Sequence, residues 1–337
     1  MSLGNFFIGI IVFFIIVLIH EFGHFIIAKL SDVKVEEFAI GMGPKLIGSQ
    51  RGETLYSIRA IPIGGFCRLT GEDGESNDSR AFNKKPIIIR IAVIIFGPLM
   101  NFFLAILIFS LVITQTTTIN EVMEDKPAYE AGIAKGDKII EIDGVKITTW
   151  DEVKPLISRS GGEPIEIVLN RHGNLKRMQI IPIEENLEEG PIIGIKPSLS
   201  VAGLSLGQGI KATVGTSVSM VDFLIKLFTG RASTDEVAGP IGIFVVVNEV
   251  AKFGFLYVLE LMAILSLNLG IINLLPIPAL DGGRLMFLFL ELIRRKPMEA
   301  EKEGFIFFIG FVMLMFLALI IAYKDLIKLN LTKLIFK

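Results

Sequence analysis

Residues 6–27 read FFIGIIVFFIIVLIHEFGHFII, an apolar run long enough to cross a bilayer that carries ionisable side chains near its end. Those side chains form the pattern His20-Glu21-Phe22-Gly23-His24. Residues four apart share one face of a helix, so His20 and His24 can both turn a ring nitrogen toward one Zn²⁺. Glu21 is then available as general base and acid and is not a ligand. The pattern predicts a hydrolytic metal site inside the membrane.

Two simpler explanations compete with the metal site. The five residues could match the pattern by chance, or the histidines could be satisfied by neighbouring helices. The chain has only 3 histidines, so a chance match at this spacing is rare. Ionisable side chains within one turn of a membrane helix are also costly to bury without a function. Both arguments favour the metal.

The composition is that of a membrane protein. Hydrophobic residues make up 52% of the chain, the mean hydropathy is +0.63, and charged residues reach 20%, against about 25% in average soluble domains. The net charge of −2 gives no reason to expect a nucleic-acid partner. The single cysteine, Cys67, excludes an internal disulfide framework and a cysteine-based zinc site.

The sequence predicts about four transmembrane helices. They are residues 6–27, 91–113, 255–275 and 305–323, each close to the roughly 20 apolar residues that a bilayer requires. Residues 210–228 contain three charged side chains and are expected to form an amphipathic helix at the membrane interface.

Basic residues predict the orientation. Residues 31–90 hold nine Lys and Arg, and residues 294–296 after the third span are all basic, so both loops are expected in the cytoplasm and the N-terminus outside. The lysines of the C-terminal tail then fall on the outer side. Either the tail lies on the outer surface as an amphipathic helix, or the number of spans differs by one.

The depth of the motif indicates a third metal ligand. Glu21 lies roughly 25 Å along a helix that starts at Gly4, in a core about 30 Å thick, and therefore near the cytoplasmic side. The third span ends at the same depth in residues 273–283, NLLPIPALDGG, where prolines and glycines break the helix around Asp281. Two histidines and a carboxylate with one open position make a catalytic zinc set. An Asp before Gly is also common as a helix cap, which is the alternative.

Residues 54–70 are predicted to form two short strands around an apolar turn, Pro62-Ile63-Gly64-Gly65. Such a hairpin is expected to dip toward the bilayer and line a water-accessible cavity, where its free edge could take up a substrate as an added strand. An ordinary cytoplasmic hairpin is the alternative.

Residues 117–183 are more polar and predict a small α+β domain outside the membrane. His172 lies in a polar turn and is expected to be exposed and inert. The predicted elements are a strand at 138–143, a turn at Asp143-Gly144, a helix at 150–158, a strand at 163–171 and a hairpin turn at His172-Gly173.

Motifs along nearly the whole chain resemble one family. They are the HEFGH run, the hairpin with Gly64-Gly65-Phe66, Phe82-Asn83-Lys84-Lys85 leading to Gly97-Pro98-Leu99-Met100-Asn101-Phe102, the PDZ-type stretch 128–137, Gly239-Pro240-Ile241-Gly242 and NLLPIPALDGG. The chain thereby resembles bacterial site-2 proteases of the regulator of sigma-E protease type, zinc peptidase family M50.

The resemblance implies an intramembrane zinc endopeptidase, a multi-pass protein of the cell membrane. Its partners would be the lipid bilayer and single-span membrane proteins, such as trimmed anti-sigma factors or remnant signal peptides. It implies substrate contacts at Asn273 and at hairpin residues Gly64, Gly65 and Phe66, and a PDZ domain that filters substrates by size. The departure is a single PDZ domain where proteobacterial members have two.

The expected fold is a polytopic α-helical membrane protein with an inserted α+β PDZ domain and a membrane-associated β-hairpin. Residues 1–114 would form the N-terminal membrane part, 115–186 the extracytoplasmic PDZ domain, 187–252 a linker with the amphipathic helix, and 253–337 the C-terminal membrane part. A non-catalytic PDZ-bearing adaptor would need no complete metal set. A zinc transporter would need acidic residues across the full membrane, and the fourth span has none.

Overall fold

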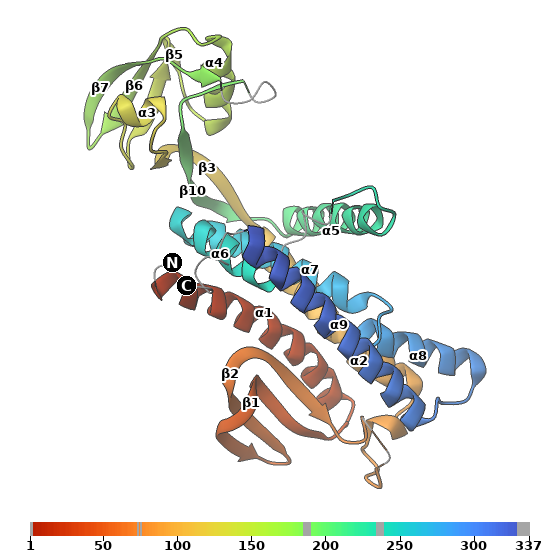
Figure 1. The fold of residues 1–337 in the computed structure, drawn as a ribbon. Coiled ribbons are helices and arrows are strands. Elements are labelled where there is room, and N and C mark those ends of the chain that lie inside the picture. The colour runs from red at the N-terminus through yellow and green to blue at the C-terminus, as the bar shows by residue number, and fades with distance from the viewer. Residues whose placement is uncertain (1–2, 73, 75, 185–189, 234–238, 329–337) are drawn as a thin grey trace, which may run out of the picture. The chain divides into compact units, whose positions relative to one another are not determined.

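The computed structural model describes residues 3–72, 74, 76–184, 190–233 and 239–328 (Figure 1). The chain divides into two compact units. One unit is mainly helical and contains residues 1–110, 205–252 and 258–337. The other contains residues 111–204 and 253–257. A second domain is therefore inserted in the sequence of the helical unit.

Four helices among the described residues are long and apolar enough to cross a membrane. The four segments are Phe7–Leu30 within α1 (Leu3–Leu30), Ile87–Phe109 (α2), Phe255–Leu274 (α7) and Glu301–Lys328 within α9 (Ala300–Lys328). The predicted bounds of the second span are wrong at both ends. Its helix starts directly after Pro86, whose fixed φ suits a helix start, and residues 111–113 already belong to a strand.

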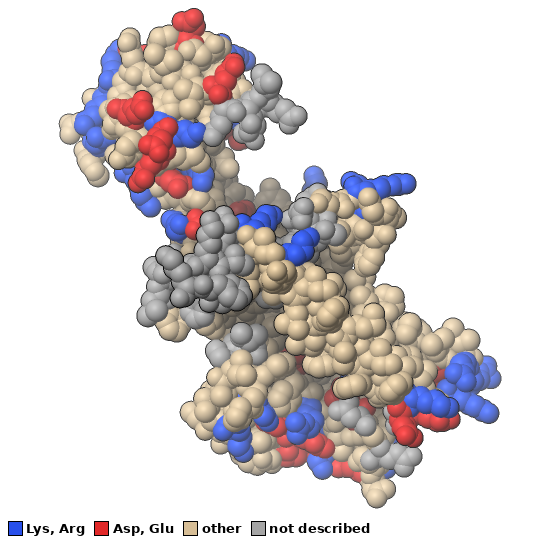
Figure 2. Space-filling view, viewed as in Figure 1, with Lys and Arg blue, Asp and Glu red and all other residues tan. Residues whose placement is uncertain are grey.

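Apolar side chains both join these helices and cover their outer surface. One buried cluster connects α1, α2 and α7 through residues such as Ile16, Ala105 and Leu267. In α9, by contrast, only 6% of the apolar window is buried. Figure 2 shows a broad uncharged band over the helical unit, with Lys, Arg, Asp and Glu gathered toward its edges. A helix that is apolar all round and faces outward is suited to lipid.

Three further α-helices lie in the described part of the helical unit, and two of them begin at polar caps. The Ser205 hydroxyl accepts a hydrogen bond from Gln208 N (3.3 Å) at the start of α5. The Asp325 carboxylate of α9 accepts from Gly239 N (3.2 Å) and Gly242 N (2.7 Å) at the start of α6. These helices are α5 (Leu206–Phe228), α6 (Pro240–Phe253) and α8 (Asp281–Arg294). The helix predicted at 210–228 is thus present.

The hairpin between α1 and α2 differs from the prediction. Its strands are β1 (Val35–Arg51) and β2 (Thr54–Leu69), with a turn at Gly52, where φ is +61°. Residues 55–58 and 65–69 run in opposite directions along residues 35–40, so the chain also reverses near the predicted turn at 62–65, but the two segments lie on either side of residues 35–40 and do not pair with each other. Residues 62–65 lie inside β2. Gly65 also serves close packing, because a Cβ built on it would lie 2.8 Å from the carbonyl oxygen of Ala39.

Both strands of this hairpin are bent, so that four short segments form the sheet. Residues 35–42 pair with 61–69 on one side, and residues 37–40 pair with 55–58 on the other. Residues 45–51 pair with 54–59. Among the described strand pairings, the segment 61–69 pairs along one side only, which makes it an edge of the sheet.

The inserted unit is a small α+β domain whose strands run in the order β10-β3-β4-β6-β7. The predicted strands, the turn at Asp143-Gly144, the helix and the hairpin at His172-Gly173 are all present, and His172 is exposed. The elements are β3 (Leu111–Val122), α3 (Pro127–Glu130), β4 (Lys138–Ile142), β5 (Val145–Lys146), a 3-10 turn (Trp150–Glu152), α4 (Val153–Arg159), β6 (Ile165–Arg171), β7 (Asn174–Ile180), β8 (Ile183–Glu184), β9 (Pro191–Ile192) and β10 (Ile195–Leu204).

The sheet of this domain includes a strand from the segment expected as a linker. β10 pairs antiparallel with β3 from Ile195 opposite Val122 to Leu204 opposite Leu111. The core is almost entirely aliphatic, with Ile139, Ile167 and Leu169 fully buried. One ion pair lies against it, in which Arg171 donates to both carboxylate oxygens of the buried Asp137 (2.6 and 2.7 Å).

Candidate active site

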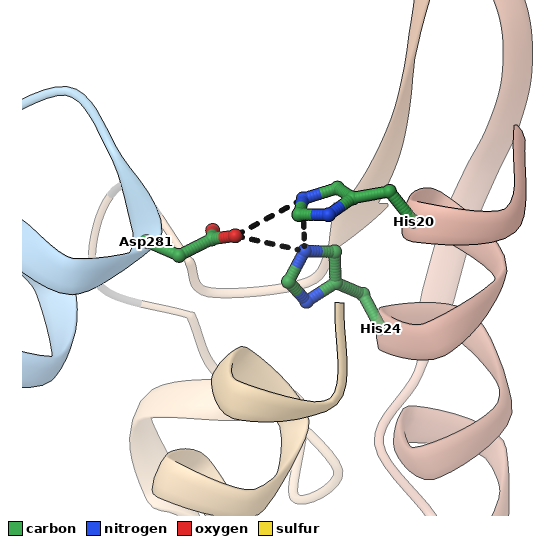
Figure 3. A group of neighbouring side chains, drawn as sticks. All are labelled: His20, His24 and Asp281. Atoms are coloured by element: carbon green, nitrogen blue, oxygen red, sulfur yellow. Dashed lines mark hydrogen bonds and ion pairs between the residues drawn. The ribbon is translucent and has the colours of Figure 1, made fainter. Parts of the chain in front are cut away.

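Two histidines one turn apart on α1 and the distant Asp281 converge in the helical unit (Figure 3). The Nε2 atoms of His20 and His24 lie 3.2 Å apart. They lie 3.0 and 3.4 Å from Oδ2 of Asp281. One potential ligand atom from each residue lies within 4.8 Å of the others, and both histidines are buried. The geometry is that of two imidazoles and a carboxylate facing one point.

Local sequence explains how Asp281 reaches the histidines. α7 ends at Leu274, and residues 275–280 reverse the chain so that Asp281 is the first residue of α8. The next two residues, Gly282 and Gly283, pack so closely against backbone atoms that neither position has room for a side chain. A Cβ on Gly282 would lie 2.1 Å from Leu275 O, and one on Gly283 would lie 2.4 Å from Ile277 O. A larger residue at either position would force the backbone that carries Asp281 or its neighbours at 274–278 to shift.

Glycines also let α2 approach the histidine face of α1. A Cβ on Gly23 would lie 2.2 Å from Phe96 O, and a Cβ on Gly97 would lie 2.2 Å from Nε2 of His24. These distances are far below ordinary contact. The site is therefore enclosed by backbone that packs directly against the imidazole of His24.

The polar atoms around the three residues fit a metal. Nδ1 of His24 lies 2.9 Å from the carbonyl oxygen of Val93. Since a carbonyl can only accept, Nδ1 carries the proton and Nε2 presents its lone pair toward Asp281. Oδ2 of Asp281 is buried without a hydrogen-bond donor in the described structure. Two imidazole nitrogens and one carboxylate oxygen with an open fourth position match a catalytic zinc site.

Glu21 and the hairpin lie together beside this site. Glu21, Gly64 and Gly65 all line one small hollow between α1 and the sheet. A Cβ on Gly65 would lie 3.5 Å from Cγ of Glu21. Phe66 does not line this hollow, and its ring lies 4.7 Å from the guanidinium of Arg59. The backbone of the hairpin edge, rather than the Phe66 ring, is therefore next to Glu21.

Asn273 reaches the same site from the end of α7. Its Nδ2 lies 3.4 Å from Nε2 of His20. Of the residues singled out from the sequence, Asn273 therefore joins His20, His24 and Asp281 at one point, while Gly64 and Gly65 lie beside Glu21 in the neighbouring hollow. Asn101 also touches His20 and was given no role by sequence reasoning. A polar residue inside an apolar span is the signal that could have drawn attention to it.

A cavity of about 900 Å³ lies elsewhere in the helical unit, among α2, α8, α9 and the segment 71–84. The Arg90 guanidinium and the Glu291 carboxylate form an ion pair in its wall, with Nη1 3.0 Å from Oε2. None of the three converging residues lines this cavity. Its size therefore does not identify it as the reaction site.

Comparison with known proteins identifies the family. The family model described as "Peptidase family M50" matches residues 8–317. The chain is 32% identical to the zinc metalloprotease RasP of Geobacillus kaustophilus, covering 95% of this chain and 97% of that protein. It is 30% identical to the regulator of sigma-W protease RasP of Bacillus subtilis, with the same coverage of 95% and 97%. The chain belongs to peptidase family M50.

A further relative agrees with this placement. A protein of Clostridium acetobutylicum that is provisionally named a zinc metalloprotease is 38% identical over 97% of this chain and 98% of its own length. The PDZ domain of an SdrC-like protein from Listeria innocua is 28% identical, covers 24% of this chain and 92% of its own, and has a TM-score of 0.22. The predicted enzyme class, a metalloprotease, is confirmed, and these relatives are named as zinc metalloproteases.

Proposed function

We propose that this protein is an intramembrane zinc endopeptidase that cleaves the transmembrane segments of single-span proteins, such as trimmed anti-sigma factors or remnant signal peptides. The observation that carries the proposal is the convergence of His20 and His24 with Asp281. The two histidines lie within one candidate span, and the carboxylate follows another after the short connection 275–280. A peptidase site assembled from apolar spans is suited to substrates that are themselves in the membrane.

In the proposed mechanism, different residues bind the metal, transfer the proton and contact the substrate. His20, His24 and Asp281 would hold Zn²⁺, which when bound activates water near neutral pH and polarises the scissile carbonyl. Glu21 would take the proton from the attacking water and return it to the leaving amine. Asn273, beside His20, would donate from Nδ2 to a substrate carbonyl. Two of the three proposed ligands and the acid–base residue come from consecutive turns of α1, and the third ligand comes from the start of α8.

A transmembrane substrate must be extended before its carbonyls can react. In a helix each carbonyl is bonded to the amide four residues on, so it is not accessible to attack. The segment 61–69 is an edge of the hairpin sheet, and it passes Glu21 at Gly65. We infer that this edge takes up part of the substrate as an added strand, with Gly64 and Gly65 allowing close approach of the backbone.

The basic loops support a proposed orientation. With residues 31–90 and 294–296 in the cytoplasm, the metal site lies toward the cytoplasmic side and the inserted domain outside. The inserted domain is proposed to be of the PDZ type and to exclude substrates with large external parts. This would restrict cleavage to proteins that another protease has already trimmed.

The proposal is tested by Glu21→Gln in detergent-purified protein. The probe is a synthetic remnant signal peptide, and fragment formation and zinc content are measured in the same samples. The variant keeps the size of the side chain and all proposed ligands, so it should retain zinc. Its cleavage rate should fall by about 10² to 10⁴-fold or more. Cleavage near the parent rate by the zinc-loaded variant would rule Glu21 out as the proton acceptor.

A further inference from the structure

The two histidines of the site make different hydrogen bonds at the ring nitrogen that faces away from Asp281. His24 directs Nδ1 at the carbonyl oxygen of Val93, 2.9 Å away. His20 directs Nδ1 at the side-chain amide of Asn101, with Nδ2 at 3.2 Å. A neutral imidazole that offers Nε2 to a metal carries its proton on Nδ1. The group that faces Nδ1 must therefore accept a hydrogen bond.

Asn101 can satisfy this requirement through its amide oxygen. Its side chain is fully buried, and in the described structure Oδ1 has no hydrogen-bond donor. The oxygen and nitrogen of an amide have nearly the same size, so a half-turn about the Cβ–Cγ bond exchanges them within the same space. After the exchange Oδ1 faces the Nδ1–H of His20. With Nδ2 in that place, two donors would oppose each other whenever Nε2 binds a metal.

We propose that Asn101 is the positioning residue of His20. Its amide oxygen accepts from Nδ1–H, fixes the tautomer that leaves Nε2 free, and holds the ring toward Asp281. This inference rests on the proposed zinc site. Partners of this kind behind metal-bound histidines typically contribute about 10- to 100-fold in metal affinity or activity.

The surrounding helices hold Asn101 in register with His20. Asn101 lies one turn after Gly97 on α2, and Gly97 packs against the ring of His24, which lies one turn after His20 on α1. On the other side, the Ser266 hydroxyl of α7 donates to the main-chain carbonyl of Asn101 (3.0 Å). The packing of α2 on α1 therefore fixes the amide at the depth of the histidine, and the bond from Ser266 reaches only the main chain.

Two substitutions of Asn101 test whether its side chain acts by accepting a hydrogen bond from His20. Asn101→Asp keeps the shape and supplies oxygen atoms that can only accept from Nδ1–H. Asn101→Leu keeps the volume and removes hydrogen bonding. Ser266→Ala is the matched control, since it removes a buried hydrogen bond to Asn101 without altering the group that faces the ring. Zinc affinity is measured on the full-length protein in detergent by competition with a chromophoric chelator, and Co²⁺ absorption spectra report the ligand geometry.

The expected result is a zinc affinity for Asn101→Leu that is about 10- to 100-fold weaker than that of the parent. Asn101→Asp and Ser266→Ala should remain within a few-fold of the parent, and their Co²⁺ spectra should be unchanged. An Asp variant that binds zinc as weakly as the Leu variant would overturn the inference, as would a Leu variant with parental affinity. If Asn101→Leu does not fold, the Asp variant alone decides. A parent protein that binds no zinc would instead contradict the proposed function.

Discussion

Replacing Gly97 with alanine perturbs the site through a single methyl group. In the structure the added Cβ would lie 2.2 Å from Nε2 of His24, about 1.2 Å closer than the 3.4 Å of ordinary contact. The ring cannot turn away without breaking the hydrogen bond from Nδ1 to Val93 O, so either the ring or α2 must move by roughly 1 Å. A misplacement of that size can cost about 10²-fold in rate. We expect a loss of this order in the cleavage rate, with weaker zinc binding.

The measurement compares parent, Gly97→Ala and a matched control for cleavage of a synthetic remnant signal peptide and for zinc content. Gly304→Ala is the control, because Gly304 is also helical and its Cβ would meet nothing within 4 Å. The control should keep the parental rate and gain up to about 1 kcal/mol of helix stability. A Gly97→Ala protein with parental zinc content and a rate within threefold of the parent would refute the close approach of α2 to His24.

Three other predictions concern the ligands and the inserted domain. The double variant His20→Ala/His24→Ala should lose the single zinc that the parent binds, and metal analysis that still finds full occupancy would contradict the ligand set. Deleting residues 111–204 and joining the ends through a short glycine linker should preserve the helical unit, because Ser205 N already donates to Ser110 O (2.8 Å). The shortened protein should cleave substrates that still carry large external domains, and a folded, zinc-loaded deletion protein that cuts not even trimmed substrate would exclude a filter role. In the inserted domain, burial alone would raise the pKa of Asp137, but hydrogen bonds from Arg171 and from Ala134 N–H outweigh it and hold the pKa below the ordinary 3.8. The stabilisation is therefore present above about pH 4 and is lost as the pH falls through that lowered value. Asp137→Asn should lower the stability of the inserted domain at neutral pH by about 1.5–3 kcal/mol. Hydrogen exchange of residues 111–204 in the full-length protein measures this loss. Unchanged protection from exchange would refute the contribution of the Asp137–Arg171 pair.

The convergence of the three proposed ligands could be predicted from sequence because most of its evidence is local. His20 and His24 are related by one helical turn, and that relation needs no tertiary structure. Asp281 required only one further argument, that spans of known length bring the end of the third helix to the level of the first. The strands at 138–142 and 165–171 could be predicted equally well, since alternating apolar and polar residues and adjacent turn residues mark each strand within a few positions.

Features that depend on contact between distant segments could not be predicted. The role of Asn101 requires the register of α2 on α1, across 81 residues of sequence. The pairing of the predicted hairpin was wrong because residues 35–40, which precede it in the chain, lie between its two strands, and the sequence of residues 54–70 alone does not show this. β10 appeared to be linker because its partner, β3, lies far before it in the chain.

The central claim is that zinc held in the apolar spans supports cleavage of a peptide bond within a membrane segment. The most direct test uses the full-length protein reconstituted in lipid vesicles with a synthetic remnant signal peptide, and locates the cut by mass spectrometry. The protein is assayed as purified, after removal of metal with a chelator, and after zinc is returned. We predict cleavage inside the apolar segment that disappears on chelation and returns with zinc. Cleavage that persists in fully stripped protein, or that falls only in the polar flanks of the peptide, would contradict the account.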